Sequence, residues 1–136
     1  IKDLIWLTDY LLPNRLGALE LTKETDVTRA AKKLLALGPE LVLITLGEDG
    51  CLLVTREKEV KIPIYRVENV VDTTGAGDAF NSAFISCIYK GMTPEEAADF
   101  ASASAALSVT KIGAQSMPKW KEVEEFIASN PPRGKG

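Results

Sequence analysis

The stretch Val71-Asp72-Thr73-Thr74-Gly75-Ala76-Gly77-Asp78-Ala79-Phe80 carries most of the information in this chain. It lies between a short apolar run at 67–71 and a helical stripe of apolar residues that ends at Gly91. The two glycines let successive backbone N–H groups face one point, to which the following helix adds its positive N-terminal end. Such a loop is suited to binding a phosphate. A structural role fits equally well, because an acid in the first helical turn and two turn glycines need no ligand.

The loop does not match either of the two common nucleotide-binding fingerprints. Phe80 stands where the dinucleotide pattern G-x-G-x-x-G needs its third glycine, and the Gly-Lys-Ser/Thr ending of a Walker loop is absent from the sequence. An NAD-binding Rossmann oxidoreductase is therefore disfavoured.

Predicted strands and helices alternate around this loop. Strands are expected at 4–12, 41–45, 51–55, 60–64 and 67–71, with Pro63 confining the fourth to an edge or an early end. The strands at 51–55 and 60–64 flank the polar run 56–59 and are predicted to form a hairpin. Helices are expected from Asp26 to the Gly38-Pro39 stop, at 80–91, from the capping box at 93–96 to Val109, and around 120–127. This order predicts an α/β layered sheet, mostly parallel, with helices on both faces. We expect a domain portion at 1–129 and a flexible tail at 130–136.

Composition narrows the class of protein. Of 136 residues, 46% are apolar and 26% charged, with a net charge of −3, which is typical of a globular chain and disfavours nucleic acid or an anionic membrane as partner. No apolar run approaches the roughly 20 residues that span a bilayer, so we expect a cytoplasmic protein. The absence of histidine excludes histidine-based catalysis within this chain, and Cys51 and Cys87 are predicted to be buried thiols. Because the chain begins mid-pattern at Ile1, we expect it to be part of a longer polypeptide.

The segment from Val71 to Phe80 resembles the signature of the ribokinase-like carbohydrate kinases, Asp-Thr-x-Gly-Ala-Gly-Asp. Three further segments resemble that family in the correct order: the turn at Leu12-Pro13-Asn14, the nucleotide loop from Ile44 to Gly50, and the late loop from Ser108 to Ser116. The resemblance implies the carboxy-terminal portion of a three-layer α/β/α fold and an ATP-dependent sugar kinase.

The resemblance also implies roles for individual residues. Asp78 would be the base that accepts the proton of the attacking sugar hydroxyl, and the amides of Gly75, Ala76 and Gly77 would form an anion hole for the γ-phosphoryl group. Nucleotide contacts would come from Asn14, Thr45, Gly47, Gly50 and Ser102.

Two cations are implied as well. A monovalent cation, usually potassium, would be held by Asp72, Thr74, Ser108, Lys111, Gly113 and Ser116, with Lys111 contributing only its carbonyl oxygen. A turn-forming role for Asp72 is the plain alternative. Magnesium would arrive with ATP and keep several of its waters.

One position departs from the family pattern. Gly17 stands where the family usually has a glutamate three residues after the asparagine of the Pro-Asn turn, and Glu20 lies one helical turn further on. We expect this departure to weaken the site.

The late loop, with Gly113-Ala114-Gln115, looks most like that of the ribokinases proper, so D-ribose is the leading expected substrate. Fructose, 2-keto-3-deoxygluconate and nucleosides stay open, because family members bind the sugar mainly through their amino-terminal half. Dimerisation through that half is a further expectation. A nucleotide-binding or structural fragment without turnover is the alternative function.

Overall fold

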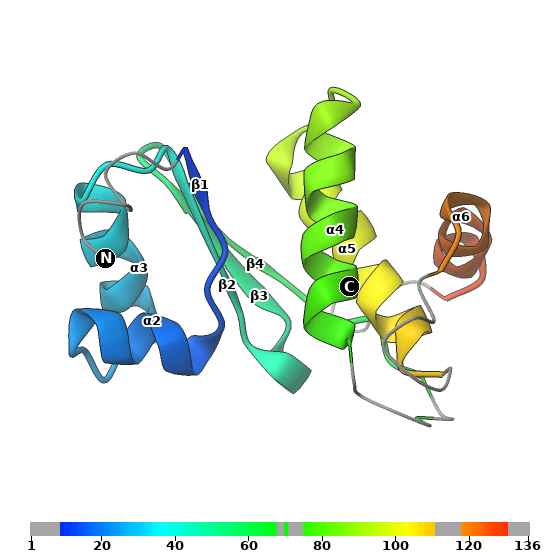
Figure 1. Ribbon diagram of the computed structural model, residues 1–136, viewed down its shortest axis with the longest axis horizontal. Coiled ribbons are helices and arrows are strands. Elements are labelled where there is room, and N and C mark those ends of the chain that lie inside the picture. The colour runs from blue at the N-terminus through cyan, green and yellow to red at the C-terminus, as the bar shows by residue number, and fades with distance from the viewer. Residues whose placement is uncertain (1–8, 68–69, 71–74, 111–117, 131–136) are drawn as a thin grey trace. The chain divides into compact units, whose positions relative to one another are not determined.

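The computed structural model describes residues 9–67, 70, 75–110 and 118–130. The chain divides into two compact units, Ile1–Ile62 and Pro63–Gly136, which we describe one at a time (Figure 1).

The first unit is a four-stranded sheet with two helices. In chain order it contains β1 (Tyr10–Leu11), α2 (Arg15–Thr22), α3 (Val27–Ala36), β2 (Leu41–Thr45), the 3-10 helix η1 (Gly47–Asp49), β3 (Cys51–Thr55) and β4 (Glu59–Ile62). The strand order in the sheet is the chain order. The strands predicted at 41–45 and 51–55 are confirmed, and β4 ends just before Pro63, as expected for a residue without an N–H donor.

The prediction of a mostly parallel sheet is wrong for the described strands. Only β1 and β2 run parallel, with Tyr10 opposite Leu41, whereas β2–β3 and β3–β4 are antiparallel. The β3–β4 pair confirms the predicted hairpin. The physical reason is connection length: a parallel pair needs a long crossover, here α2 and α3, while the short turns after β2 and β3 permit only antiparallel pairing.

Helix α2 was missing from the predicted elements, which had only a turn after Pro13. Its sequence contains Gly17, a weak helix former, and carries no acid in the first turn. The helix begins nonetheless because the Asn14 side chain accepts a hydrogen bond from the Gly17 N–H at 2.7 Å. Helix α3 begins directly after Asp26, where the predicted helix starts, and the Asp26 side chain caps it by accepting from the Arg29 N–H at 3.0 Å.

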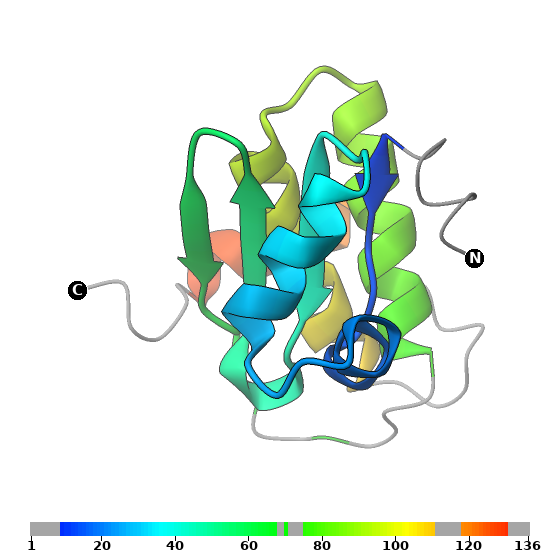
Figure 2. The ribbon, with the colours of Figure 1, turned by 90° about the vertical axis from the view of Figure 1, so that its left-hand side faces the viewer.

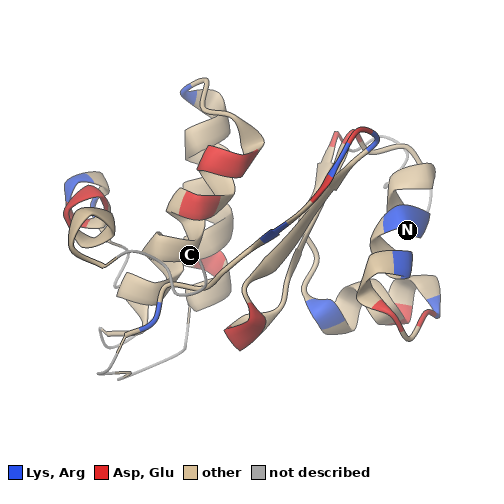
Figure 3. Cartoon of the chain, turned by 180° about the vertical axis from the view of Figure 1, so that it is seen from behind, with Lys and Arg blue, Asp and Glu red and all other residues tan. Residues whose placement is uncertain are grey.

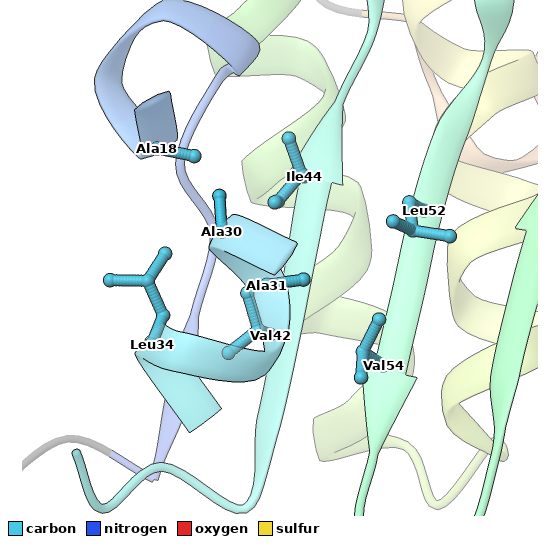
Figure 4. Close-up of a cluster of buried hydrophobic side chains, with 8 residues drawn as sticks. All are labelled: Ala18, Ala30, Ala31, Leu34, Val42, Ile44, Leu52 and Val54. Carbon is cyan, nitrogen blue, oxygen red and sulfur yellow. The ribbon is translucent and has the colours of Figure 1, made fainter. Parts of the chain in front are cut away.

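The core of the first unit forms where α2 and α3 pack on β2 and β3 (Figures 2 and 4). Apolar side chains from all four elements are buried there: Ala18, Ala30, Ala31, Leu34, Val42, Ile44, Leu52 and Val54. Three alanines on the helices let the two helices approach the branched side chains of the strands closely. This packing fixes the carboxyl ends of β1 and β2, where the candidate site residues of this unit lie.

The second unit contains three helices, α4 (Ala76–Tyr89), α5 (Pro94–Ser108) and α6 (Trp120–Ser129), all close to their predicted ranges. Helix α5 packs against both α4 and α6. The Phe100 and Trp120 rings stack at 4.1 Å between centroids, and the Lys90 ammonium lies 4.0 Å from the Trp120 ring centroid. These contacts tie the three helices together.

The strand predicted at 67–71 is not present at Val67 or Val70, since a strand needs a neighbour in a ladder and neither residue has one among the described residues. Residues 68, 69 and 71 lie outside the described residues, as do residues 4–8 of the strand predicted at 4–12 and residues 131–136 of the predicted tail. Among the helices of the described residues, none has the length and apolarity needed to cross a membrane.

Candidate active site

Gly75 and the first turn of α4 hold the predicted anion hole and base. Gly75 is the residue before the helix and adopts φ 84°, ψ 0°, a left-handed conformation that glycine reaches without steric cost. The Ala79 N–H donates to the Gly75 carbonyl at 2.8 Å, which closes the first helical turn. The N–H groups of Ala76, Gly77 and Asp78 precede that bond, so they have no partner within the helix and face outward at its positive end.

No side chain of the described residues caps this helix. Gly75 has no side chain to offer, whereas α2, α3 and α5 each begin with a side chain that accepts an amide hydrogen. The amides at the start of α4 are therefore left for an acceptor from outside the helix, as an anion would be.

Gly77 and Asp78 are exposed in this first turn. Gly77 does not have a positive φ, and a Cβ built on it meets no atom within 4 Å other than its own surroundings in the helix. Neither backbone strain nor packing among the described residues thus requires glycine here. Because alanine is the better helix former, the glycine is better explained by a ligand that approaches this backbone closely.

The first unit brings four other predicted residues together at the carboxyl ends of β1 and β2. Asn14 forms a parallel bridge with Thr45, and the Thr45 N–H donates to the Pro13 carbonyl at 3.1 Å. The loop that follows is closed by the Leu46 N–H, which donates to the Gly50 carbonyl at 2.8 Å. Gly47 and Gly50 take φ 60° and 84°, so this turn favours glycine at both ends.

The Gly17 position shows why a larger residue does not fit easily there. A Cβ at Gly17 would lie 3.1 Å from Asn14 Oδ1, the atom that caps α2 through the Gly17 N–H. Glu20 lies exposed on the same helix, in its second turn. The backbone therefore presents Asn14 and an amide at this point but no carboxylate.

Ser102 and Ser108 are both buried in α5, and their hydroxyl groups already have acceptors. Ser102 Oγ lies 3.4 Å from the Pro63 carbonyl oxygen, and Ser108 Oγ donates to the Ala105 carbonyl at 2.7 Å. A hydroxyl group that donates its hydrogen keeps its oxygen lone pairs, so both side chains could still accept a hydrogen bond or contact a cation. The other five predicted cation ligands, Asp72, Thr74, Lys111, Gly113 and Ser116, lie outside the described residues. Within the described ranges, no group of three acidic or sulfur side chains is placed to hold a metal ion.

The electrostatics of the second unit separate structural groups from candidate catalytic ones. Burial raises the pKa of the Cys87 thiol to about 11, so this cysteine is protonated at neutral pH and is no nucleophile. Burial also raises the pKa of Tyr65. The hydrogen bond that the Tyr65 hydroxyl donates to Asp99 at 2.9 Å raises this pKa further. Both residues are core residues, and the prediction of buried free thiols at Cys51 and Cys87 is confirmed.

The sequence interpretation missed one contact at the nucleotide loop. Arg15 Nη2 lies 2.8 Å from Asp49 Oδ2 and 3.5 Å from the Leu46 carbonyl oxygen, and so links the start of α2 to η1. The two charged residues are 34 positions apart, and no local pattern pairs them.

Comparison with known proteins identifies the family to which this chain is similar. The model of the pfkB family carbohydrate kinases matches residues 1–121. Ribokinase from Bacillus subtilis (strain 168) is 44% identical over 120 residues, which cover 88% of this chain and 39% of the relative.

Solved structures agree. Arabidopsis thaliana ribokinase, in a structure described as complexed with ribose and ATP, is similar with a TM-score of 0.88 and 36% identity, over 93% of this chain and 43% of that one. A putative ribokinase II from E. coli, in complex with ATP and Mg²⁺, has a TM-score of 0.87 and 31% identity, over 94% of this chain and 42% of that one. These likenesses confirm the expected fold class, a portion of the three-layer α/β/α ribokinase-like fold.

The chain spans about two fifths of the length of the relatives that it matches. The family match covers most of the chain and includes the Gly75–Asp78 turn and the Gly47–Gly50 loop. On this evidence the chain belongs to the pfkB family of carbohydrate kinases.

Proposed function

We propose that the protein to which this chain belongs transfers the γ-phosphoryl group of ATP to a hydroxymethyl group of a small sugar, with D-ribose as the leading substrate. The observation that carries the proposal is the start of α4, where an exposed Asp78 stands beside amides that no side chain of the described residues caps. An acid and a set of free amide donors within one helical turn are what this reaction needs.

In this proposal Asp78 takes the proton of the attacking hydroxyl group. A carboxylate within hydrogen-bond reach of that oxygen acts as general base, a role that contributes about 10²- to 10⁴-fold to rate. The exposed position of Asp78 leaves room for a substrate to reach it. The amides of Gly75, Ala76 and Gly77 would stabilise the negative charge on the transferred phosphoryl oxygens, because fixed dipoles act most strongly where charge develops.

The first unit would bind the nucleotide. Asn14, Thr45, Gly47 and Gly50 gather at one edge of the sheet, and backbone amides in a glycine turn are suited to phosphate oxygens. The Arabidopsis and E. coli structures are complexes with ATP, which supports this assignment. Ser102, in α5, would contact the nucleotide near its adenine ring.

Two cations belong to the proposal. Mg²⁺ bound with ATP would neutralise part of the phosphate charge, and the E. coli structure, a complex with ATP and Mg²⁺, supports this part of the proposal. Gly17 offers it no carboxylate, and Glu20 is the acid that α2 presents instead. A potassium ion would be held by main-chain and side-chain oxygens of Asp72, Thr74, Ser108, Lys111, Gly113 and Ser116.

The proposal also covers the sugar substrate, the cellular compartment and the oligomeric state. Ribose is favoured because the most similar relatives are named ribokinases and the Arabidopsis structure contains ribose. We also propose that the protein works in the cytoplasm, to which its two buried free cysteines are suited, and forms a homodimer through a part of the molecule outside this chain.

One alternative has a specific observation behind it. A nucleotide-binding fragment without turnover is favoured by Gly17, which removes an acid from the site, and by the chain's span of about two fifths of its relatives.

Sugar-dependent release of ADP from ATP tests the proposal. We expect ADP release by the full chain with Mg²⁺, K⁺ and ribose, and about a 10²- to 10⁴-fold lower kcat for Asp78→Asn. Glu96→Gln is the matched control, because Glu96 holds the same third position in α5, and it should keep full turnover. ATP binding without turnover would favour the fragment, and full activity of Asp78→Asn would show that another group is the base.

A further inference from the structure

The loop proposed to bind the phosphates carries two acids of its own. Glu48 and Asp49 lie side by side in η1 and are both exposed, so their negative charges stand between Gly47 and Gly50. Figure 3 shows this acidic turn in red at the end of the sheet. A triphosphate carries several negative charges, and like charges a few ångströms apart repel even in water. A polyphosphate site in this turn therefore needs a nearby positive charge.

Arg15 supplies that charge. Its guanidinium group contacts Asp49 Oδ2 at 2.8 Å and the Leu46 carbonyl oxygen at 3.5 Å, and it lies directly after Asn14, another residue of the proposed nucleotide set. It also links the two segments that leave the sheet from the paired ends of β1 and β2, α2 on one side and η1 on the other.

The contact is too exposed to be explained by stability. The Arg15 and Asp49 side chains are 47% and 64% exposed, and exposed ion pairs contribute about 1 kcal/mol or less to folding. The fold does not depend on this pair, but the charge of the loop does.

We propose that Arg15 is a positioning residue for nucleotide binding. Arg15 cancels the charge of Asp49 and holds η1 against the start of α2, so that the loop accepts the phosphates. This inference rests on the proposed nucleotide-binding role of the loop and goes beyond it, because it assigns a function to a residue outside the family motif. Arg15 acts through Asp49 and is not itself placed on the reacting atoms.

The test is ATP affinity of the full chain, measured by calorimetry with ATP and Mg²⁺ and by KM in the ADP-release assay. Arg15→Ala should weaken ATP binding about five- to tenfold, the effect of one uncancelled charge near the phosphates, and should raise KM for ATP more than it lowers kcat. The loss should shrink as salt is added. An unchanged affinity would overturn the proposal.

Rescue distinguishes charge cancellation from a merely structural contact. Adding Asp49→Asn to Arg15→Ala removes the uncancelled charge, so the double variant should return to within about twofold of the parent affinity. Failure of this rescue would overturn the charge role. Arg15→Lys, which keeps the charge but loses the fork geometry, should retain most of the affinity.

Lys32 and Glu59 provide a matched control pair within the same unit. Their charged groups lie 3.9 Å apart on α3 and β4, away from the nucleotide loop, and their side chains are 65% and 41% exposed. Lys32→Ala should change ATP affinity by less than twofold and stability about as little as Arg15→Ala does. An equal loss of affinity in Lys32→Ala would show a general charge effect and overturn the assignment to Arg15.

Failure of the proposed function gives a different result. If the parent chain binds no ATP, the nucleotide role of the loop falls and the inference falls with it. If the parent binds ATP and Arg15→Ala binds it equally well, only the inference is overturned.

Discussion

Helices α4 and α5 both carry an exposed acid at their third position, Asp78 in α4 and Glu96 in α5. Glu96 turns back on its own helix: its Oε1 accepts from the Thr93 N–H at 3.2 Å and from the Thr93 hydroxyl at 2.9 Å. Thr93 in return accepts from the Glu96 N–H at 3.2 Å. In α5 the acid and the first amides are used by the helix itself.

In α4 the corresponding groups are not used in this way. Gly75 stands where α5 has its capping threonine, so no N-cap side chain accepts the first amides of α4. Two neighbouring helices of one unit thus show a closed start and an open one, with the same type of acid in the same position. The difference teaches that a helix start built for a ligand is recognised by the cap it lacks as much as by its charge.

Among changes that leave Asp78 in place, the largest expected effect comes from filling the open start at its second position. Gly77→Ala places a methyl group where no atom of the described residues lies, so stability should rise by up to about 1 kcal/mol from helix propensity. Turnover should fall about ten- to a hundredfold, because the methyl group occupies the space of the transferred phosphoryl group. Steady-state kinetics and thermal unfolding measure the two effects.

Glu95→Ala is the matched control, because it places alanine at the second position of α5. This variant should leave turnover unaltered. Full turnover of Gly77→Ala would show that no ligand approaches this backbone closely. It would contradict the proposal that the start of α4, unlike that of α5, faces a ligand.

Gly75→Ala tests the left-handed residue before α4. At φ 84° an alanine is strained, and we expect the free energy of unfolding to fall by about 1 to 2 kcal/mol, with lower turnover because the amides change direction. Gly91, after the end of α4, has φ 90° and space for a Cβ, so Gly91→Ala should cost similar stability without loss of turnover. Equal loss of turnover in both variants would assign the effect to general destabilisation.

Thr93→Ala opens the closed start of α5. Loss of the cap should lower the free energy of unfolding by about 1 kcal/mol in a denaturant titration. Turnover at temperatures well below unfolding should not change, because this helix start serves the fold alone. A drop in kcat at full folding would mean that α5, too, contributes to the reaction.

Much of this comparison was present in the sequence, because helix starts are local. The capping box at Thr93 to Glu96 and the glycines before Asp78 are patterns of a few neighbouring residues. Helix α5 begins at its capping box, whereas α4 begins at Ala76, four residues before the range predicted from its apolar stripe. The buried strand at 41–45 was equally predictable from its continuous apolar run.

What the sequence could not supply depends on contacts between distant residues. Strand direction was mispredicted because turn length after β2, and not apolarity, decides whether the neighbour runs antiparallel. Helix α2 was missed because Gly17 interrupts its sequence and its first turn has no acid, while its start depends on one hydrogen bond that the Asn14 side chain accepts from the Gly17 N–H. The Arg15–Asp49 contact spans 34 residues and has no periodic signal. The roles of Asp78 and the other site residues stay predictions.

The smallest expected effect is the pH dependence of the closed start. Hydrogen bonds from the Thr93 hydroxyl and then from its N–H hold the pKa of Glu96 below its ordinary value of 4.5. A carboxyl group whose pKa is lower in the folded state stabilises the fold above its unfolded-state pKa, and this contribution is lost as pH falls through the folded-state pKa.

Glu96→Gln keeps a capping side chain but removes the charge, so the parent should be the more stable protein at pH 7, by a small margin. That margin should shrink as pH falls through the folded-state pKa of Glu96, which lies below 4.5, and should disappear once Glu96 is protonated in both the folded and the unfolded state. Denaturant titrations of the two proteins at pH 7, 5 and 3.5 measure it, and since every other carboxyl group is shared, the difference reports Glu96 alone. A margin that grew on acidification would mean that the Glu96 charge opposes the helix start instead of closing it, and the distinction drawn between α4 and α5 would then rest on Thr93 only.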